Sequence, residues 1–250
     1  MALRRGPGHN AGAMADPARL QLLAFDVFGT VVDWYGSIAR EVESMGLGVR
    51  GGELALAWRD GYRPAMDRVR SGELPWTRLD ELHRMILDEV LPRLGAGHLS
   101  EERRRHLNRA WHRLDPWPDA VPGLTRLRRR YTLCTLSNGN LGLLADMAKR
   151  AGLPWDCILS AEVFRRYKPD PEAYLGACRA FDLEPGQMLM VAAHRDDLAG
   201  ARRAGCATAY VARPLERGPG APAGPARDPE ADWNARDLQD LADQLGCPPA

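Results

Sequence analysis

The fold is decided by the stretch Leu22-Leu23-Ala24-Phe25-Asp26-Val27-Phe28-Gly29-Thr30. Four apolar residues lead into one carboxylate, and a Gly-Thr pair follows. A continuous apolar run of this kind is typical of a buried parallel strand. Open α/β sheets bind ligands beyond the carboxyl ends of their strands, and a carboxylate there can act as a covalent nucleophile. The alternative is that Asp26 only caps a turn.

Strands and helices alternate through most of the chain. Strands are expected at 20–26, 131–136, 157–159, 188–193 and 208–211, and helices at 120–130, 141–151, 171–181, 198–204 and 235–245. Such alternation predicts an α/β fold in which helices cover both faces of a parallel sheet. Residues 213–230 are rich in proline and glycine, which predicts an irregular surface stretch.

One long segment interrupts the alternation. Helices are expected at 37–46, 53–70, 76–92 and 100–113, with no convincing strand among them. Because this block is too long for a loop, it predicts an inserted small domain. The expected division is a disordered tail over 1–17, an α/β core over 18–35 and 115–250, and a helical cap domain over 36–114.

The composition excludes several classes of function. The 250 residues carry a formal net charge of +1, so no general attraction to nucleic acid or to anionic membranes is expected. The chain has no run of about 18 apolar residues, so no membrane span is expected, and its start lacks the apolar region of a secretory signal. The five cysteines form no C-x-x-C pair. We therefore expect buried free thiols and a cytoplasmic protein.

Lysine is rare in this chain. Only Lys149 and Lys168 occur, so the other 32 of the 34 basic residues are arginine. Lys149 stands in the last turn of an expected helix, where a cation favours the helix dipole. Lys168, in Tyr167-Lys168-Pro169, has no helix to serve. A compact ammonium in place of an arginine fork therefore suggests a specific task for Lys168.

Reactive side chains stand at the ends of four expected strands or loops, in a fixed order along the chain. The motifs are Phe-Asp-x-x-Gly-Thr at Asp26, Leu-Ser-Asn-Gly at Ser137, Tyr-Lys-Pro at Lys168 and Asp-Leu-Ala-Gly-Ala at Asp197. This order resembles the haloacid dehalogenase superfamily over nearly the whole chain from about residue 20. The resemblance implies an α/β fold class, with a Rossmann-like parallel sheet core and an inserted helical cap domain.

Two substitutions decide which branch of the superfamily the chain resembles. Phosphatases of the superfamily carry a second aspartate where Phe28 stands, and a magnesium-ligating aspartate where Ala193 stands. Magnesium needs hard oxygen ligands, which neither side chain offers. The sequence therefore resembles the type II, L-2-haloacid dehalogenase branch, and the resemblance implies no metal and no cofactor.

The resemblance implies a covalent mechanism. Asp26 attacks the carbon that bears the halogen, and water then attacks the ester carbonyl, which turns an L-2-haloacid into a D-2-hydroxy acid. Because burial would raise the pKa of Asp26, a nearby ammonium must oppose that shift, and Lys168 is the candidate. The hydroxyls of Thr30 and Ser137 can orient the carboxylate. Asp197 is the candidate to orient or deprotonate the water.

The same resemblance suggests which residues bind the substrate, a small halogenated carboxylic acid. Backbone amides beside the nucleophile, at Val27 and Phe28, can bind its carboxylate. Arg59 matches the family's halide-binding arginine, and Asn138 supplies an amide N–H where negative charge develops on the halide. A homodimer is common in the family and is expected here.

The sequence departs from the family at two places. Ala192, Ala193 and His194 replace the usual Ser-x-Asn motif, and His194 could donate to the ester, the substrate carboxylate or the water. Asp60, beside Arg59, puts an acid near an anionic substrate unless Arg63 or Arg195 pairs with it.

Each assignment has a purely structural alternative. Asp197 and Ser137 could cap helices, and Asn138 before Gly139 could serve only a turn. Arg59 could be a solvated arginine, and His194 a surface or hydrogen-bonded residue. The aromatic side chains that could either line the pocket or pack the cap are Trp58, Tyr62 and Trp76.

Three other functions stay open from the sequence. A related hydrolase could use the same aspartyl ester on a fluorinated acid or an azetidine ring. A magnesium-dependent phosphatase is the second alternative. The third is a member that binds phosphate or does not catalyse at all.

Overall fold

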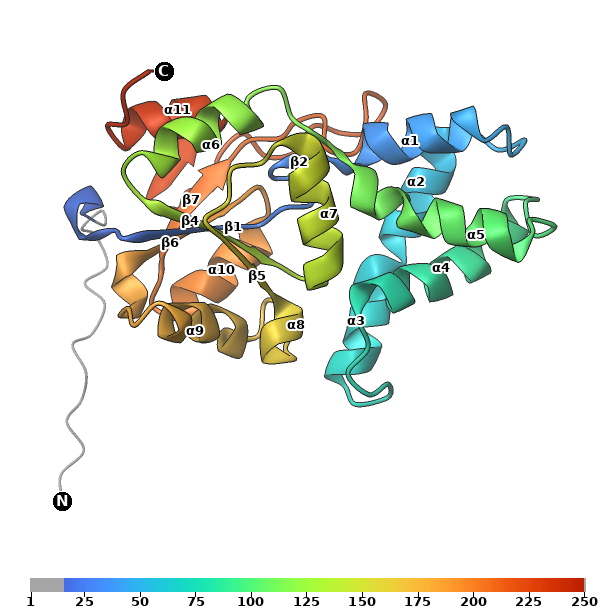
Figure 1. Ribbon diagram of the computed structural model, residues 1–250, viewed down its shortest axis with the longest axis horizontal. Coiled ribbons are helices and arrows are strands. Elements are labelled where there is room, and N and C mark those ends of the chain that lie inside the picture. The colour runs from blue at the N-terminus through green and yellow to red at the C-terminus, as the bar shows by residue number, and fades with distance from the viewer. Residues whose placement is uncertain (1–15, 250) are drawn as a thin grey trace.

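The structure, a computed structural model, describes residues 16–249, so the expected tail lies outside it apart from Asp16 and Pro17. At its centre is a six-stranded sheet in the order β5-β4-β1-β6-β7-β8 (Figure 1). Its strands are β1 (Leu22–Phe25), β4 (Thr132–Ser137), β5 (Cys157–Ser160), β6 (Met188–Ala192), β7 (Ala207–Val211) and β8 (Trp233–Ala235). Every neighbouring pair is parallel. The predicted parallel sheet is confirmed, and Asp26 directly follows its central strand.

Both faces of the sheet are buried. Along β1, Leu23 and Phe25 pack into one apolar cluster and Leu22 and Ala24 into another, because alternate side chains of a strand point to opposite faces. Helices α6 (Ala120–Arg128), α7 (Leu141–Ala151) and α11 (Leu238–Gln244) cover one face. Helices α9 (Pro171–Ala180) and α10 (Arg195–Arg203) cover the other, with α8 (Ala161–Phe164) beside α9 (Figure 1). The fold is therefore the expected Rossmann-like α/β arrangement.

A helical segment lies at one end of this sheet, on the right in Figure 1. It runs between the two-residue strands β2 (Val32–Asp33) and β3 (Asp115–Pro116), which pair antiparallel. Its helices are α1 (Trp34–Ser44), α2 (Gly51–Asp60), α3 (Tyr62–Arg70), α4 (Leu79–Arg93) and α5 (Glu101–Asn108), followed by a 3-10 turn at Arg109–Arg113. We refer to it as the α1–α5 segment.

Several elements differ from those predicted. The helix expected at 53–70 is split at Gly61, where a Cβ atom would lie only 2.4 Å from the Ile86 side chain. The helix expected at 198–204 begins at Arg195, so Asp197 lies inside its first turn. The elements β2, β3, β8 and α8 were not predicted, since two to four residues are too few to show a period. Residues 213–230 contain no helix or strand, as predicted.

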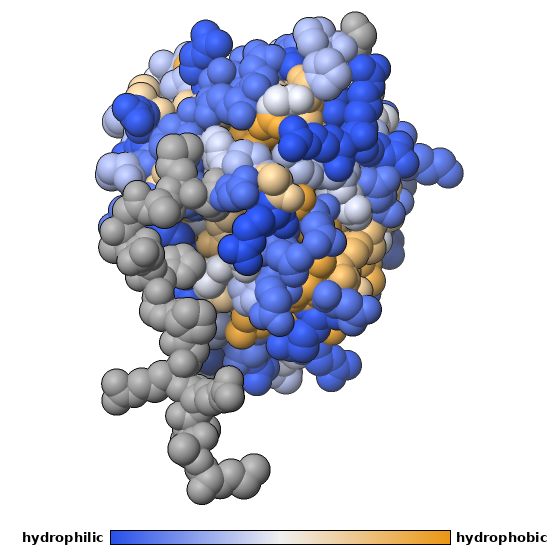
Figure 2. Space-filling view, turned by 90° about the vertical axis from the view of Figure 1, so that its left-hand side faces the viewer, coloured by the Kyte–Doolittle hydropathy of each residue, from blue (hydrophilic) through white to orange (hydrophobic). Residues whose placement is uncertain are grey.

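The helices, the surface and the cysteines can be compared with what the composition predicts. No helix in the described range is long and apolar enough to cross a membrane. The face turned away from the α1–α5 segment is mainly hydrophilic, with apolar patches between the polar residues (Figure 2). All five cysteines are free; Cys134, Cys178, Cys206 and Cys247 are buried, and Cys157 is half-buried.

Candidate active site

A cavity of about 500 Å³ lies between the carboxyl ends of the central strands and helices α2 and α3. Asp26 after β1, Asn138 after β4 and His194 after β6 line it from the sheet, and Arg59 and Tyr62 from the helices. Of the site residues predicted from the sequence, all but Val27, Thr30 and Ser137 line this cavity. The parallel topology brings Asp26, Asn138 and His194 together because all the strands end at the same edge.

Asp26 is buried, with 7% of its surface exposed, and is surrounded by donors. Its Oδ1 lies 3.1 Å from Nζ of Lys168. Its Oδ2 accepts a hydrogen bond from Thr30 Oγ1 at 2.9 Å and lies 3.1 Å from His194 Nδ1. Burial raises the pKa of Asp26, but Lys168 and His194 outweigh it and hold the pKa below its usual range. The carboxylate therefore stays ionised at neutral pH.

Lys168 joins Asp26 to a second buried carboxylate. Its Nζ lies 2.5 Å from Oδ2 of Asp197, and Tyr174 donates its hydroxyl proton to Oδ1 of Asp197 at 2.6 Å. Burial lowers the pKa of Lys168, but the two carboxylates outweigh it and raise that pKa above its usual range. Asp197 is not the N-cap of α10, because His194 occupies that position and Asp197 lies inside the first turn. The interpretation of Asp197 as a mere helix cap is therefore wrong.

The two hydroxyls expected beside Asp26 differ in their partners. Thr30 Oγ1 accepts a hydrogen bond from the Ala193 N–H at 2.9 Å, so its own proton is free to point at Asp26. Ser137 Oγ instead accepts from the Gly139 N–H at 3.2 Å. Within residues 16–249 Ser137 makes no hydrogen bond to Asp26, and the N-cap of α7 is Asn140.

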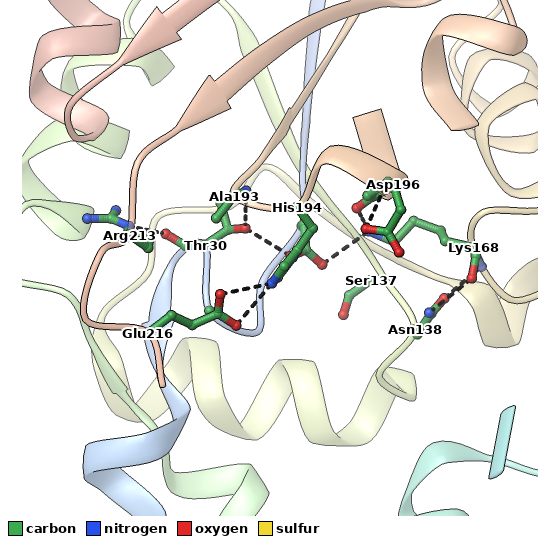
Figure 3. A network of polar contacts seen from close by, with 12 residues as sticks. Thr30, Ser137, Asn138, Lys168, Ala193, His194, Asp196, Arg213 and Glu216 are labelled. Carbon is green, nitrogen blue, oxygen red and sulfur yellow. Dashed lines mark hydrogen bonds and ion pairs between the residues drawn. The ribbon is translucent and has the colours of Figure 1, made fainter. Parts of the chain in front are cut away.

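His194 connects Asp26 to a glutamate that the sequence did not suggest. Its Nε2 lies 3.0 and 3.1 Å from the two carboxylate oxygens of Glu216, so the ring lies between two carboxylates (Figure 3). Burial lowers the pKa of His194, but Glu216 and Asp26 outweigh it and raise the pKa to about 10. The imidazole is therefore protonated at neutral pH.

The loop that carries Glu216 is held at several points. Glu216 Oε1 accepts from Trp34 Nε1 at 2.9 Å. Arg213 binds both oxygens of Asp119 at 2.7 Å and donates from Nε to the carbonyl of Thr30 at 2.9 Å. Gly29, with φ +84°, leaves the room that Glu216 needs, because a Cβ there would lie 2.3 Å from Glu216 Oε1. The loop thus brings Glu216 to a fixed position.

Arg59 reaches the cavity from α2. Its guanidinium lies 4.3 Å from the centre of the Tyr62 ring and 5.5 Å from that of Trp34. Its Nη1 is buried and has no hydrogen-bond partner among the described residues. The interpretation of Arg59 as a solvated surface arginine is therefore wrong, and a buried donor at a cavity is left to bind a ligand.

The acid beside Arg59 is also paired, but not with the residues expected. Asp60 lies 2.7 Å from Arg217, which directly follows Glu216 in the same loop. Arg63 pairs with Asp196 instead, and Arg195 donates to the carbonyl of Arg227. The Asp60–Arg217 and Arg63–Asp196 pairs connect the α1–α5 segment to the rest of the structure at the edge of the cavity.

Not all of the remaining predicted residues are free to bind a ligand at the cavity. Phe28 lines the cavity, and the backbone N–H groups of Val27 and Phe28 donate to no acceptor in the described part of the chain. Asn138 also lines it, but its Oδ1 already accepts from the Lys168 N–H at 2.8 Å and its Nδ2 lies 3.3 Å from Met66 Sδ. Among the aromatic candidates, Tyr62 lines the cavity, while Trp58 is fully buried and Trp76 packs on Tyr167.

The donor set around Asp26 is poor for a metal. Phe28 and Ala193 offer no side-chain oxygen, and the Lys168 ammonium already lies between the two carboxylates. In the described range, no three His, Cys, Asp or Glu side chains gather so that they could hold a metal ion. The residues present do not fit a magnesium centre.

Comparison with known proteins places this site in a family. The family described as haloacid dehalogenase-like hydrolase matches residues 20–205. The chain belongs to the haloacid dehalogenase-like hydrolases. This confirms the resemblance drawn from the four motifs, which lie inside the matched range.

Several relatives of this haloacid dehalogenase-like hydrolase are named as dehalogenases. The chain is 30% identical to (S)-2-haloacid dehalogenase 4A of Burkholderia cepacia over 78% of its own length and 84% of that protein. It is 46% identical to a solved L-2-haloacid dehalogenase, with a TM-score of 0.87 over 91% of this chain and 100% of the other. A solved defluorinating L-2-haloacid dehalogenase is 44% identical, with a TM-score of 0.87 over 90% and 95% of the two chains.

Sequence reasoning missed four contributors to the site of this hydrolase. Tyr174 and Trp34 sit in helices whose apolar periodicity accounts for them without a polar role. Glu216 and Arg213 lie in the Pro/Gly-rich loop, which has no period that could single them out. Their partners in the site are 22 to 183 residues away in the chain, so only the fold reveals them.

Proposed function

We propose that this protein hydrolyses the carbon–halogen bond of short L-2-haloacids to give D-2-hydroxy acids, through an ester on Asp26 and without a metal. The names of its relatives support hydrolytic dehalogenation of 2-haloacids. The observation that carries the proposal is the Lys168 ammonium, which lies between the buried carboxylates of Asp26 and Asp197 at the cavity. It keeps Asp26 anionic, which a nucleophile requires.

The first half of the reaction is a displacement at carbon. Asp26 attacks the carbon that bears the halogen, a carbon–oxygen bond forms, and the halide leaves with the electron pair of the broken bond. Arg59 Nη1 is the donor we assign to the departing halide, because it is buried at the cavity and unpartnered in the described chain. We assign a second, weaker contact to the Asn138 amide, which faces Met66.

The substrate carboxylate needs donors of its own. The N–H groups of Val27 and Phe28 follow the nucleophile directly, and neither donates within the described residues. We propose that they bind this carboxylate, which would place the halogen-bearing carbon against Asp26. The side chain of Phe28 then forms an apolar wall of the cavity.

The second half of the reaction is hydrolysis of the ester. We propose that Asp197 orients a water molecule and accepts its proton as the water attacks the ester carbonyl. Burial and the neighbouring Asp26 raise the pKa of Asp197, although Lys168 and Tyr174 oppose this. A raised pKa makes a carboxylate a better base.

We also propose that residues 36–114 form a cap domain over a core of residues 18–35 and 115–250. Arg59 and Tyr62 of this segment complete a cavity whose nucleophile lies in the sheet domain. The Arg217–Asp60 and Arg63–Asp196 pairs would help to hold the cap against the core.

We also propose a cellular compartment and an oligomeric state. The free, mostly buried cysteines support a reducing compartment, and we propose the cytoplasm. A homodimer is proposed from the family resemblance alone. Light scattering of the purified protein would give the mass of the particle.

The experiment that tests the function is halide release from L- and D-2-chloropropionate by the wild type and by Asp26→Asn. We expect release from the L enantiomer, a D-lactate product, and loss of release in Asp26→Asn. A single turnover in oxygen-18 water should leave the label in Asp26, since water attacks the ester carbonyl.

Metal dependence supplies the contrary outcome. Turnover should survive a chelator such as EDTA. The contrary result is turnover that vanishes with the chelator and returns with magnesium, together with hydrolysis of p-nitrophenyl phosphate. That result would show that the protein is a phosphatase and not a dehalogenase.

A further inference from the structure

We propose that His194 and Thr30 form the oxyanion site for hydrolysis of the Asp26 ester, and that Glu216 holds His194 in place as a cation. The inference rests on the proposed function and deepens it, because it assigns the two half-reactions to different groups. Lys168 and Arg59 serve the first half, and the Glu216–His194 pair serves the second.

The hydrogen bonds of Asp26 show which oxygen can attack. A carboxylate oxygen has two acceptor lone pairs. Oδ2 uses both, one for Thr30 Oγ1 and one for His194 Nδ1. Oδ1 has only the Lys168 ammonium, at 3.1 Å. Oδ1 therefore keeps a free lone pair and becomes the ester oxygen, while Oδ2 becomes the ester carbonyl oxygen.

The arrangement of acceptors fixes the charge of His194. Nδ1 faces Oδ2 of Asp26 and Nε2 faces both oxygens of Glu216, so each ring nitrogen has a carboxylate opposite it. Only the imidazolium carries an N–H on both nitrogens. Beyond these two carboxylates, the Lys168 ammonium lies beside Asp26, and the Arg59 guanidinium acts electrostatically on Glu216.

Neither donor needs to move when the oxyanion forms. The Ala193 N–H binds Thr30 Oγ1 and directs the hydroxyl proton toward Asp26. Glu216 is held by Trp34 Nε1, and its loop by Arg213. Donors fixed in advance of the charge they stabilise are the basis of an oxyanion hole.

The hydrolysis step balances around these groups. Water oxygen bonds to Cγ of Asp26, its proton passes to Asp197, and the carbonyl electron pair moves onto Oδ2, which faces His194 and Thr30. The pair then returns, the Cγ–Oδ1 bond breaks, and the leaving alkoxide on Oδ1 takes a proton from Lys168, which Asp197 replaces with the proton it took from water. The hydroxyl left on Cγ then releases the second water proton. The products are the free carboxylate of Asp26, the hydroxy acid and one proton.

The charge on Oδ2 changes in opposite directions in the two halves. It decreases during alkylation, because the carboxylate becomes a neutral ester, and it increases during attack by water. A cation beside Oδ2 therefore accelerates hydrolysis and does not accelerate alkylation, since only interactions that strengthen in the transition state raise a rate.

The test is rapid-mix kinetics of His194→Gln and Glu216→Gln with L-2-chloropropionate, with His106→Gln as control. His106 is an exposed histidine of α5 whose Nε2 lies 2.8 Å from Glu41, so it reproduces a histidine–carboxylate pair away from the cavity. Two readouts are taken together, namely the burst of chloride in the first turnover and the mass of the intact protein.

In both site variants we expect a chloride burst as fast as in the wild type or faster, one equivalent per enzyme. Steady-state turnover should fall by about 10² to 10³ fold in His194→Gln, and less in Glu216→Gln, which keeps the imidazole. The alkylated protein should accumulate. The control should behave as the wild type.

Two results would overturn the inference. One is wild-type turnover in both variants, and the other is loss of the burst, which would assign His194 to the first half-reaction. If His194→Gln does not fold, the result for Glu216→Gln alone decides the test. Absence of chloride release by the wild type would instead overturn the proposed function, so the two failures are distinguishable.

Discussion

Nζ of Lys168 lies 3.1 Å from Oδ1 of Asp26, the carboxylate oxygen that keeps a free lone pair. The same ammonium lies 2.5 Å from Asp197, and only 5% of the Lys168 side chain is exposed. One cation thus compensates two buried carboxylates. Arginine could supply the charge, but its broad fork would not fit where a compact ammonium lies between two carboxylates.

Replacement of this ammonium should remove both activity and stability. In Lys168→Met the two buried carboxylates lose the ammonium that they share, so the pKa of Asp26 rises and a larger fraction of the nucleophile is protonated. We expect the first-turnover chloride release to disappear and the unfolding free energy to fall by about 3–5 kcal/mol. Halide assay and urea unfolding measure the two effects.

The other lysine of the chain is the matched control. Lys149 is exposed at the end of α7, so Lys149→Met should leave both measurements nearly unchanged. Full chloride release by Lys168→Met would contradict the role given to the ammonium.

Sequence reasoning could predict the parts of this site that follow strand ends. Asp26 and Asn138 come directly after apolar runs, and the edge of a parallel sheet collects such residues whatever their distance in the chain. Lys168 was singled out because lysine is rare here. These signals are local, so they could be read without the structure.

The rest depends on packing that no local pattern encodes. Glu216 lies in a loop without periodicity, and its position is set by Trp34, Arg213 and the space over Gly29. His194 stayed ambiguous in the sequence because its charge is decided by Glu216. Gly61, where the predicted helix is split, likewise lies against Ile86 of another helix, and no local pattern encodes that contact.

Arg59 should matter for activity far more than for stability. Its Nη1 has no partner in the described protein, so Arg59→Met loses mainly the cation–π contacts with Tyr62 and Trp34, worth about 1–2 kcal/mol. We expect chloride release in the first turnover to slow by about 10² to 10³ fold. Arg50→Met, an exposed arginine at the start of the same helix, is the control. Equal rates for the two variants would remove Arg59 from the halide site.

The stability supplied by His194 should decline at alkaline pH. The pKa of His194 is raised from 6.5 to about 10 in the folded protein, so the folded state holds this proton more tightly than the unfolded chain. The contribution is fully present below about pH 6.5 and is lost as the pH rises through about 10. The difference in unfolding free energy between the wild type and His194→Gln should therefore shrink over this range.

Glu216 is the largest source of that shift, and this can be tested. In Glu216→Gln the pKa of His194 should move down, so the stability difference caused by His194→Gln in this background should shrink at a lower pH. Urea unfolding at a series of pH values gives both curves. Identical curves in the two backgrounds would mean that Glu216 does not hold the proton.

Thr30 should contribute through its hydroxyl and not through its shape. Thr30→Val keeps the volume but removes the acceptor for the Ala193 N–H and the donor to Asp26. Leaving a buried N–H unsatisfied costs about 1–3 kcal/mol, which urea unfolding would measure. Because the same hydroxyl donates to Oδ2, hydrolysis of the ester should also slow, with alkylated protein accumulating under steady turnover. Thr30→Ser keeps the hydroxyl and should restore the hydrolysis rate, whereas equal rates in the valine and serine variants would show that the hydroxyl does not act on Oδ2.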